Sequence, residues 1–101
     1  MRLLIVVSTP AKLRDVEGLS TAAVKANHDV TIFFNEEAIT LLKNPSPVEY
    51  LYADLLACRA SAVEYQITAE NMAVNARMSS LGELVDQLES NDRVVFLGCS
   101  N

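Results

Sequence analysis

The chain alternates short apolar runs with amphipathic stretches. Residues 3–7, 51–57 and 93–97 are apolar over most of their length, and Asp54 interrupts the second of these runs. Residues 29–34 form a further run that is rich in β-branched and aromatic side chains. Continuous runs of this length predict strands that are buried on both faces of a sheet. We therefore expect a strand at each of these four positions.

Helices are predicted between the strands. Residues 13–26 carry apolar side chains at helical spacing, and Asn27 is a typical left-handed residue at the end of a helix. Asn35 follows the second strand and is placed to cap a helix whose first turn holds Glu36 and Glu37. Acidic residues are favoured there by the helix dipole.

Two segments have the form of a capping box, a serine followed three residues later by a glutamate. One pairs Ser61 with Glu64, and the other pairs Ser80 with Glu83. Each predicts the start of a helix, with helix-favouring residues from position 60 onward in the first case. A short edge strand around residues 72–74 completes the predicted elements.

Strands that alternate with helices predict an α/β protein. We expect a single domain over residues 1–101, a three-layer α/β/α sandwich with a mostly parallel sheet of four to five strands. Ligands bind such sheets at the carboxyl ends of the strands. Ser8 and Thr9 follow the first strand, and Asn35 and Glu36 follow the second. We expect these four residues to line a strand-end pocket.

Cys58 follows the third predicted strand and directly precedes a predicted helix. Unpaired N–H groups at a helix start favour an anion, and the thiolate is the reactive form of cysteine. Arg59, Ala60 and Ser61 are therefore candidates for a supporting anion site. Free cysteine is also often an inert core residue. The spacing alone gives reactive and structural roles similar weight.

Composition excludes several classes of protein. The 101 residues carry a formal net charge of −5, which argues against nucleic acid or an anionic membrane as the main partner. The apolar runs are too short to span a bilayer. Three glycines, with no glycine-rich loop after the first strand, make a dinucleotide or P-loop site improbable. One histidine and two distant cysteines do not make a zinc site, and we expect neither a metal nor a cofactor.

The two cysteines, Cys58 and Cys99, do not form a disulfide framework. We expect reduced thiols and a cytoplasmic protein. Two strands between them would separate the two residues by ~14 Å, which is too far for a bridge. Cys99 lies near the end of the chain, so we expect it to be an incidental thiol.

Six segments in order resemble the DsrE-like proteins, small sulfur-relay proteins that include the DsrE/F/H and TusB/C/D groups. They are residues 5–7 with Pro10, 28–34, 35–38, 58–62, 80–84 and 92–96. The resemblance implies an α/β/α sandwich with a parallel sheet of about five strands. It also implies a homotrimer, a hexamer or an assembly of related subunits. Family members often have a glycine at the end of the helix after the cysteine, where this chain has Gln66 and Ile67.

In active members of the family, the cysteine that matches Cys58 carries a sulfane sulfur as a persulfide. The resemblance thus implies a sulfur-donor protein and a sulfur-acceptor protein as partners. Our leading hypothesis is a sulfur-relay protein, a sulfurtransferase or persulfide carrier, that works through Cys58. The alternative is a non-catalytic assembly or small-ligand-binding module in which Cys58 is a structural thiol.

Overall fold

The computed structural model describes residues 1–98 and shows a five-stranded parallel sheet. The spatial order is β4-β3-β2-β1-β5, and each neighbouring pair is parallel. The strands are β1 (Arg2–Val7), β2 (Asp29–Phe34), β3 (Asp54–Cys58), β4 (Ala76–Ser79) and β5 (Arg93–Leu97). The predicted α/β class and the mostly parallel sheet are therefore confirmed.

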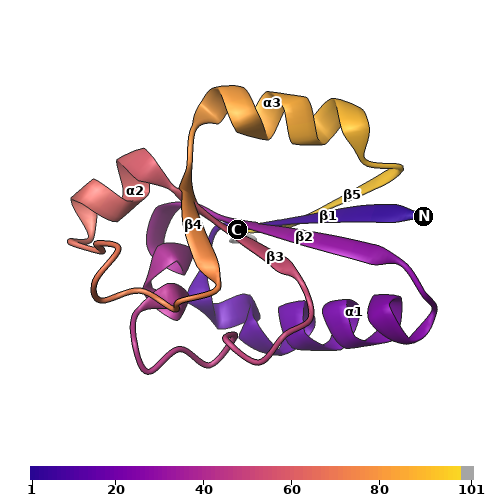
Figure 1. Ribbon diagram of the computed structural model, residues 1–101, viewed down its shortest axis with the longest axis horizontal. Coiled ribbons are helices and arrows are strands. Elements are labelled where there is room, and N and C mark those ends of the chain that lie inside the picture. The colour runs from indigo at the N-terminus through magenta and orange to yellow at the C-terminus, as the bar shows by residue number, and fades with distance from the viewer. Residues whose placement is uncertain (99–101) are drawn as a thin grey trace.

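Helices cover both faces of the sheet (Figure 1). On one face lies α1 (Leu13–Lys25), together with the 3₁₀ helices η1 (Pro10–Lys12) and η2 (Glu36–Leu42). On the other face lies α3 (Leu81–Ser90), while the short α2 (Arg59–Glu64) extends from the carboxyl end of β3 and contacts η2. Among the described residues, no helix is long and apolar enough to cross a membrane.

The core is much larger on the α1 face than on the α3 face. The α1-face cluster contains buried residues from the central strands, α1, η2 and the segment between η2 and β3, such as Ile32, Val16 and Leu42. The smaller cluster consists of Leu4, Val6, Phe33, Leu56 and Cys58, with Leu84 and Val94 packed against it. α3 has no fully buried residue. Burial of apolar area is the main stabilising term in folding, so α3 is held to the sheet by few such contacts.

Residues in the left-handed region end two of the helices. Asn27 has φ 65° after α1, as its sequence position predicts, and the N–H of His28 donates to the carbonyl of Ala23. Gln66 has φ 58° after α2, and the N–H of Ile67 donates to the carbonyl of Ala62. Both ends form the Schellman arrangement, which favours glycine or asparagine at the left-handed position.

The third strand is shorter at its start than predicted. It begins at Asp54, not Leu51, and it includes Cys58 as its last residue. Leu51 is 6% exposed, but it is buried by a turn in which its N–H donates to the carbonyl of Val48. A buried apolar side chain in a packed loop has the same pattern as a strand residue, which explains the error.

Two further predictions fail at the residue level. Ser61 does not cap α2, because the helix begins at Arg59 and places Ser61 inside its first turn. The edge strand lies at Ala76–Ser79, not at residues 72–74. Met72 instead forms an isolated antiparallel bridge with Lys43, and its buried side chain has the same sequence pattern as a strand residue.

Candidate functional site

Cys58 lies at the junction of β3 and α2. It is the last residue of β3 and the N-cap residue of α2, with extended backbone angles (φ −60°, ψ 118°). The buried run Leu55–Ala57 fixes the strand, and the exposed Arg59 and Ala60 begin the helix. The N–H groups of the first helical turn have no partner inside the helix. Arg59, Ala60 and Ser61 directly follow Cys58 at this junction, but the Cys58 side chain makes no cap hydrogen bond to α2, and an anion site at these residues stays a prediction.

The Cys58 side chain belongs to the small cluster on the α3 face, and the residue is 5% exposed. Alternation along β3 places Leu56 on the same face as Cys58 and Ala57 on the opposite face. Ser79 of β4 is the neighbour of Cys58 in the parallel pairing, and it is 2% exposed. The thiol therefore lies at the covered carboxyl end of the sheet, beside the strand that leads into α3.

The predicted strand-end residues interact with one another. The Ser8 hydroxyl donates to Oδ1 of Asn35 at 2.7 Å, which joins the ends of β1 and β2. Asn35 makes no side-chain cap to η2, contrary to the expected N-cap role. Thr9 instead caps η1, where its hydroxyl accepts a hydrogen bond from the N–H of Ala11. That these residues line a ligand pocket stays a prediction.

Ser61 connects the Cys58 junction to the end of β2. Its hydroxyl accepts a 2.7 Å hydrogen bond from the N–H of Glu36, and the residue is buried. Glu36 has φ 49°, a left-handed conformation that its side chain disfavours. Of the predicted site residues, Glu36 and Ser61 are thus brought into direct contact by the fold.

Acidic side chains lie around α2. Burial, and then the charges of Glu64, Glu37 and Glu36, raise the pKa of Tyr65. These three carboxylates belong to exposed residues. Among the residues that precede and begin α2, the exposed Arg59 supplies a positive charge next to Cys58. Three exposed acidic side chains therefore lie near Tyr65 at the end of α2.

The sequence did not reveal an ion-pair network beside Cys58. Nη1 and Nη2 of Arg77 donate to the two carboxylate oxygens of Glu83 at 3.1 and 2.7 Å. The Ser79 hydroxyl donates to Oε1 of Glu83 at 2.7 Å. The predicted cap at Ser80 is confirmed, because its hydroxyl accepts from the N–H of Glu83 at 3.1 Å. The sequence feature that concerns Glu83 is the predicted capping box. It predicts that the Glu83 carboxylate binds the backbone N–H of Ser80, not the side chains of Arg77 and Ser79.

The hydrogen bonds from Arg77, and then the one from Ser79, lower the pKa of Glu83. The same contact with Glu83 raises the pKa of Arg77. The bidentate geometry makes this a charge-assisted pair of defined orientation. The network therefore ties β4 to the first turn of α3 at the strand position that neighbours Cys58.

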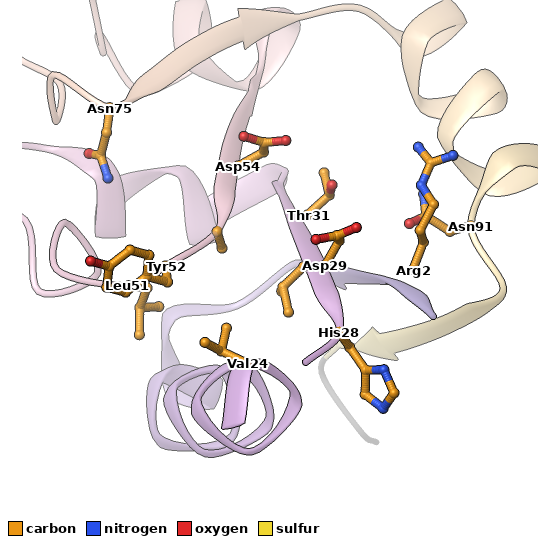
Figure 2. A pocket seen from close by; sticks show the side chains of 12 residues that line it. Arg2, Val24, His28, Asp29, Thr31, Leu51, Tyr52, Asp54, Asn75 and Asn91 are labelled. Carbon is orange, nitrogen blue, oxygen red and sulfur yellow. The ribbon is translucent and has the colours of Figure 1, made fainter. Parts of the chain in front are cut away.

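A wide hollow of about 710 Å³ lies at the opposite end of the sheet (Figure 2). Asp29 and Thr31 from β2 and Asp54 from β3 lie along it, with Arg2 nearby. These residues are at the amino ends of the strands, so the hollow is separate from the Cys58 junction. Among residues 1–98, no three His, Cys, Asp or Glu residues are grouped so as to hold a metal ion.

Comparisons with known structures agree with this architecture. The crystal structure of the ychN protein from E. coli has a TM-score of 0.74 and 15% sequence identity, and the match covers 96% of this chain and 100% of that one. A protein of unknown function, MTH1491 from Methanobacterium thermoautotrophicum, has a TM-score of 0.70 and 12% identity, and the match covers 97% of this chain and 98% of that one. At these identities the likeness concerns the fold.

A search of curated proteins finds no match. The family model of the DsrE/DsrF-like family matches residues 1–97, which is nearly the whole chain. The matched range runs from β1 to β5 and so contains Cys58. The chain therefore belongs to the DsrE/DsrF-like family.

Proposed function

We propose that this protein is a cytoplasmic sulfur-relay protein that carries a sulfane sulfur on Cys58. The observation that carries the proposal is the position of Cys58, a free thiol at the end of β3 and at the start of a helix, in a chain of the DsrE/DsrF-like family. Free N–H groups at such a junction favour an anionic sulfur.

The transfer is a pair of thiol exchanges. The Cys58 thiolate attacks the outer sulfur of a donor persulfide, the donor S–S bond breaks, and the donor leaves as a thiolate. Cys58 then carries the persulfide until an acceptor thiolate attacks its outer sulfur and releases the Cys58 thiolate. The two steps need no external oxidant or reductant, because each breaks one S–S bond and forms another.

Two features of the site support this chemistry. The N–H groups of residues 59–61 and the guanidinium of Arg59 follow Cys58 directly in the chain and are the candidate groups to stabilise a sulfur anion, although the Cys58 side chain makes no cap hydrogen bond in the folded state. The acidic residues around α2 favour donor and acceptor proteins that present a basic surface, since complementary charge speeds encounter. Because Cys58 is 5% exposed, exchange with a partner also requires the thiol to be uncovered.

Self-association is a second proposal, and a surface on α3 favours it. Leu81, Val85 and Leu88 lie on one side of α3 and are 65%, 51% and 37% exposed. Phe96, on the α3 side of β5, is 66% exposed. Large exposed apolar areas mark interaction sites, and stable interfaces bury about 800 Å² per partner. We propose a second copy of this chain as the occupant, which is also the assembly role of the alternative hypothesis.

Mass spectrometry after exposure of the native protein to polysulfide tests the relay. We expect added sulfur on the Cys58 peptide, removable by a thiol reductant. Cys99→Ser should keep the added mass, whereas Cys58→Ser should lose it with its fold intact by circular dichroism. Equal loading of the two variants, or no loading of Cys58 in the folded protein, would contradict the relay and leave assembly as the function.

A further inference from the structure

The carboxylate of Glu83 joins two elements that meet beside Cys58. It accepts hydrogen bonds from Arg77 and Ser79 on β4, while its own N–H donates to the N-cap hydroxyl of Ser80. Its side chain is 28% exposed and that of Arg77 is 58% exposed. Ser79, in contrast, is buried and is the strand neighbour of Cys58. One glutamate thus fixes the start of α3 to the position next to the thiol.

Few buried apolar contacts hold α3 to the sheet. The helix has no buried residue, and Leu84 is its residue that packs against the cluster containing Cys58. Leu84, which packs against the cluster, directly follows Glu83 in the chain, and Glu83 is hydrogen-bonded to β4. Segments with few buried apolar contacts open locally at a lower free energy than the core does.

We propose that Glu83 is a positioning residue that holds the first turn of α3 over the Cys58 site and thereby sets how readily a partner reaches the thiol. Loss of the hydrogen bonds from Arg77 and Ser79 to Glu83 lets Leu84 and the first turn of α3 move away from the cluster. This movement would expose the Cys58 thiol whether or not the protein carries sulfur. Its meaning for sulfur exchange rests on the proposed relay function.

Two substitutions separate anchoring from charge. Arg77→Ala and Glu83→Gln each break the ion pair, but they change the local charge in opposite directions. If Arg77 and Glu83 act on Cys58 only through their fields, the first variant disfavours the thiolate and the second favours it. If they act by holding α3, both variants uncover Cys58. An increase in the reactivity of Cys58 in both variants therefore shows that Arg77 and Glu83 act by holding α3 in place.

The experiment measures the rate of alkylation of native Cys58 by iodoacetamide in a Cys99→Ser background. We expect a roughly two- to fivefold increase for both variants, the size that follows from loss of a partly exposed ion pair. Asp15→Asn is the matched control, because it breaks the Lys12–Asp15 pair at the start of α1. We expect the control to alkylate at the parent rate, and Arg77→Lys to restore part of the protection.

Urea unfolding measures the free energy of unfolding of each variant. That value gives the rate of Cys58 alkylation expected if the thiol reacts only in the globally unfolded protein. Rates for Arg77→Ala and Glu83→Gln that match the parent, that move in opposite directions, or that rise only as far as global unfolding explains would overturn the proposal. Alkylation does not require sulfur loading. A Cys58 that both variants uncover but that never takes up sulfur would therefore uphold the anchor and contradict the relay.

Discussion

Cys58 and Ser79 are neighbours across the parallel pairing of β3 and β4, and the Ser79 hydroxyl donates to Glu83 at the start of α3. Cys58 is thus connected to the starts of two helices. It is the N-cap residue of α2, and it is joined to the start of α3 through Ser79 of β4. The Cys58 junction thus lies at the opposite end of the sheet from the wide hollow at the amino ends of the strands.

Acid should weaken the hydrogen bonds that join Glu83 of α3 to Arg77 and Ser79 of β4. The pKa of Glu83 is lowered by Arg77 and Ser79, so the stability that Glu83 contributes is present above its ordinary value of 4.5 and is lost as the pH falls through the lower folded value. The charge of Asp54 also raises the pKa of Arg77, the partner of Glu83. We expect Glu83→Gln to be less stable than the parent at neutral pH.

That difference should shrink toward zero in acid, where the parent carboxyl is also uncharged. Urea unfolding of both proteins across the acid range, with and without Asp54→Asn, measures it. A difference that is independent of pH would show that the ionised carboxylate of Glu83 is not the stabilising group.

Gln66→Gly should stabilise the fold. Gln66 has φ 58° at the end of α2, and a residue with a Cβ atom is disfavoured there relative to glycine. We expect a gain of about 1 kcal/mol in the free energy of unfolding. Gln66→Ala is the matched control, because it removes the same polar group but keeps the Cβ atom. If alanine stabilises as much as glycine, backbone strain is not the cause.

Ser20→Ala should also stabilise the protein. Ser20 is 1% exposed in α1, and its hydroxyl has no hydrogen-bond partner among residues 1–98. A buried hydroxyl without a partner costs about 1 kcal/mol or more, and alanine favours helix more than serine does. Thr21→Ala, at the exposed neighbouring position, measures the helix-propensity part alone. Urea unfolding should show a larger gain at position 20, and equal gains would contradict the prediction.

The order of elements and the parallel sheet were predictable because the apolar runs are short, continuous and separated by helical spacing. The position of Cys58 at a strand–helix junction followed from the same pattern. Exact boundaries did not follow, because a buried loop residue such as Leu51 and a bridge residue such as Met72 carry the same apolar signal as a strand. Local periodicity reports burial, and the hydrogen bonding that defines a strand depends on its neighbours.

The hydrogen-bond partners of the site were the least predictable part. Ser61 and Asn35 both have sequence contexts that predict helix caps, but each oxygen is engaged by a residue more than twenty positions away, Glu36 and Ser8 respectively. Glu83 is likewise bound by Arg77 and Ser79 of the preceding strand. A capping motif encodes a local option, and tertiary contacts decide whether it is used.

Val85→Glu should disrupt self-association through α3. Val85 lies between Leu81 and Leu88 on the exposed apolar side of the helix, and it is 51% exposed. A buried charge without a partner is strongly unfavourable at an interface, so the variant should have a lower mass than the parent by light scattering at the same concentration. Val74→Glu is the matched control, since Val74 is 88% exposed in the segment before β4. An unchanged mass for Val85→Glu, or an equal loss for Val74→Glu, would rule out α3 as the contact surface.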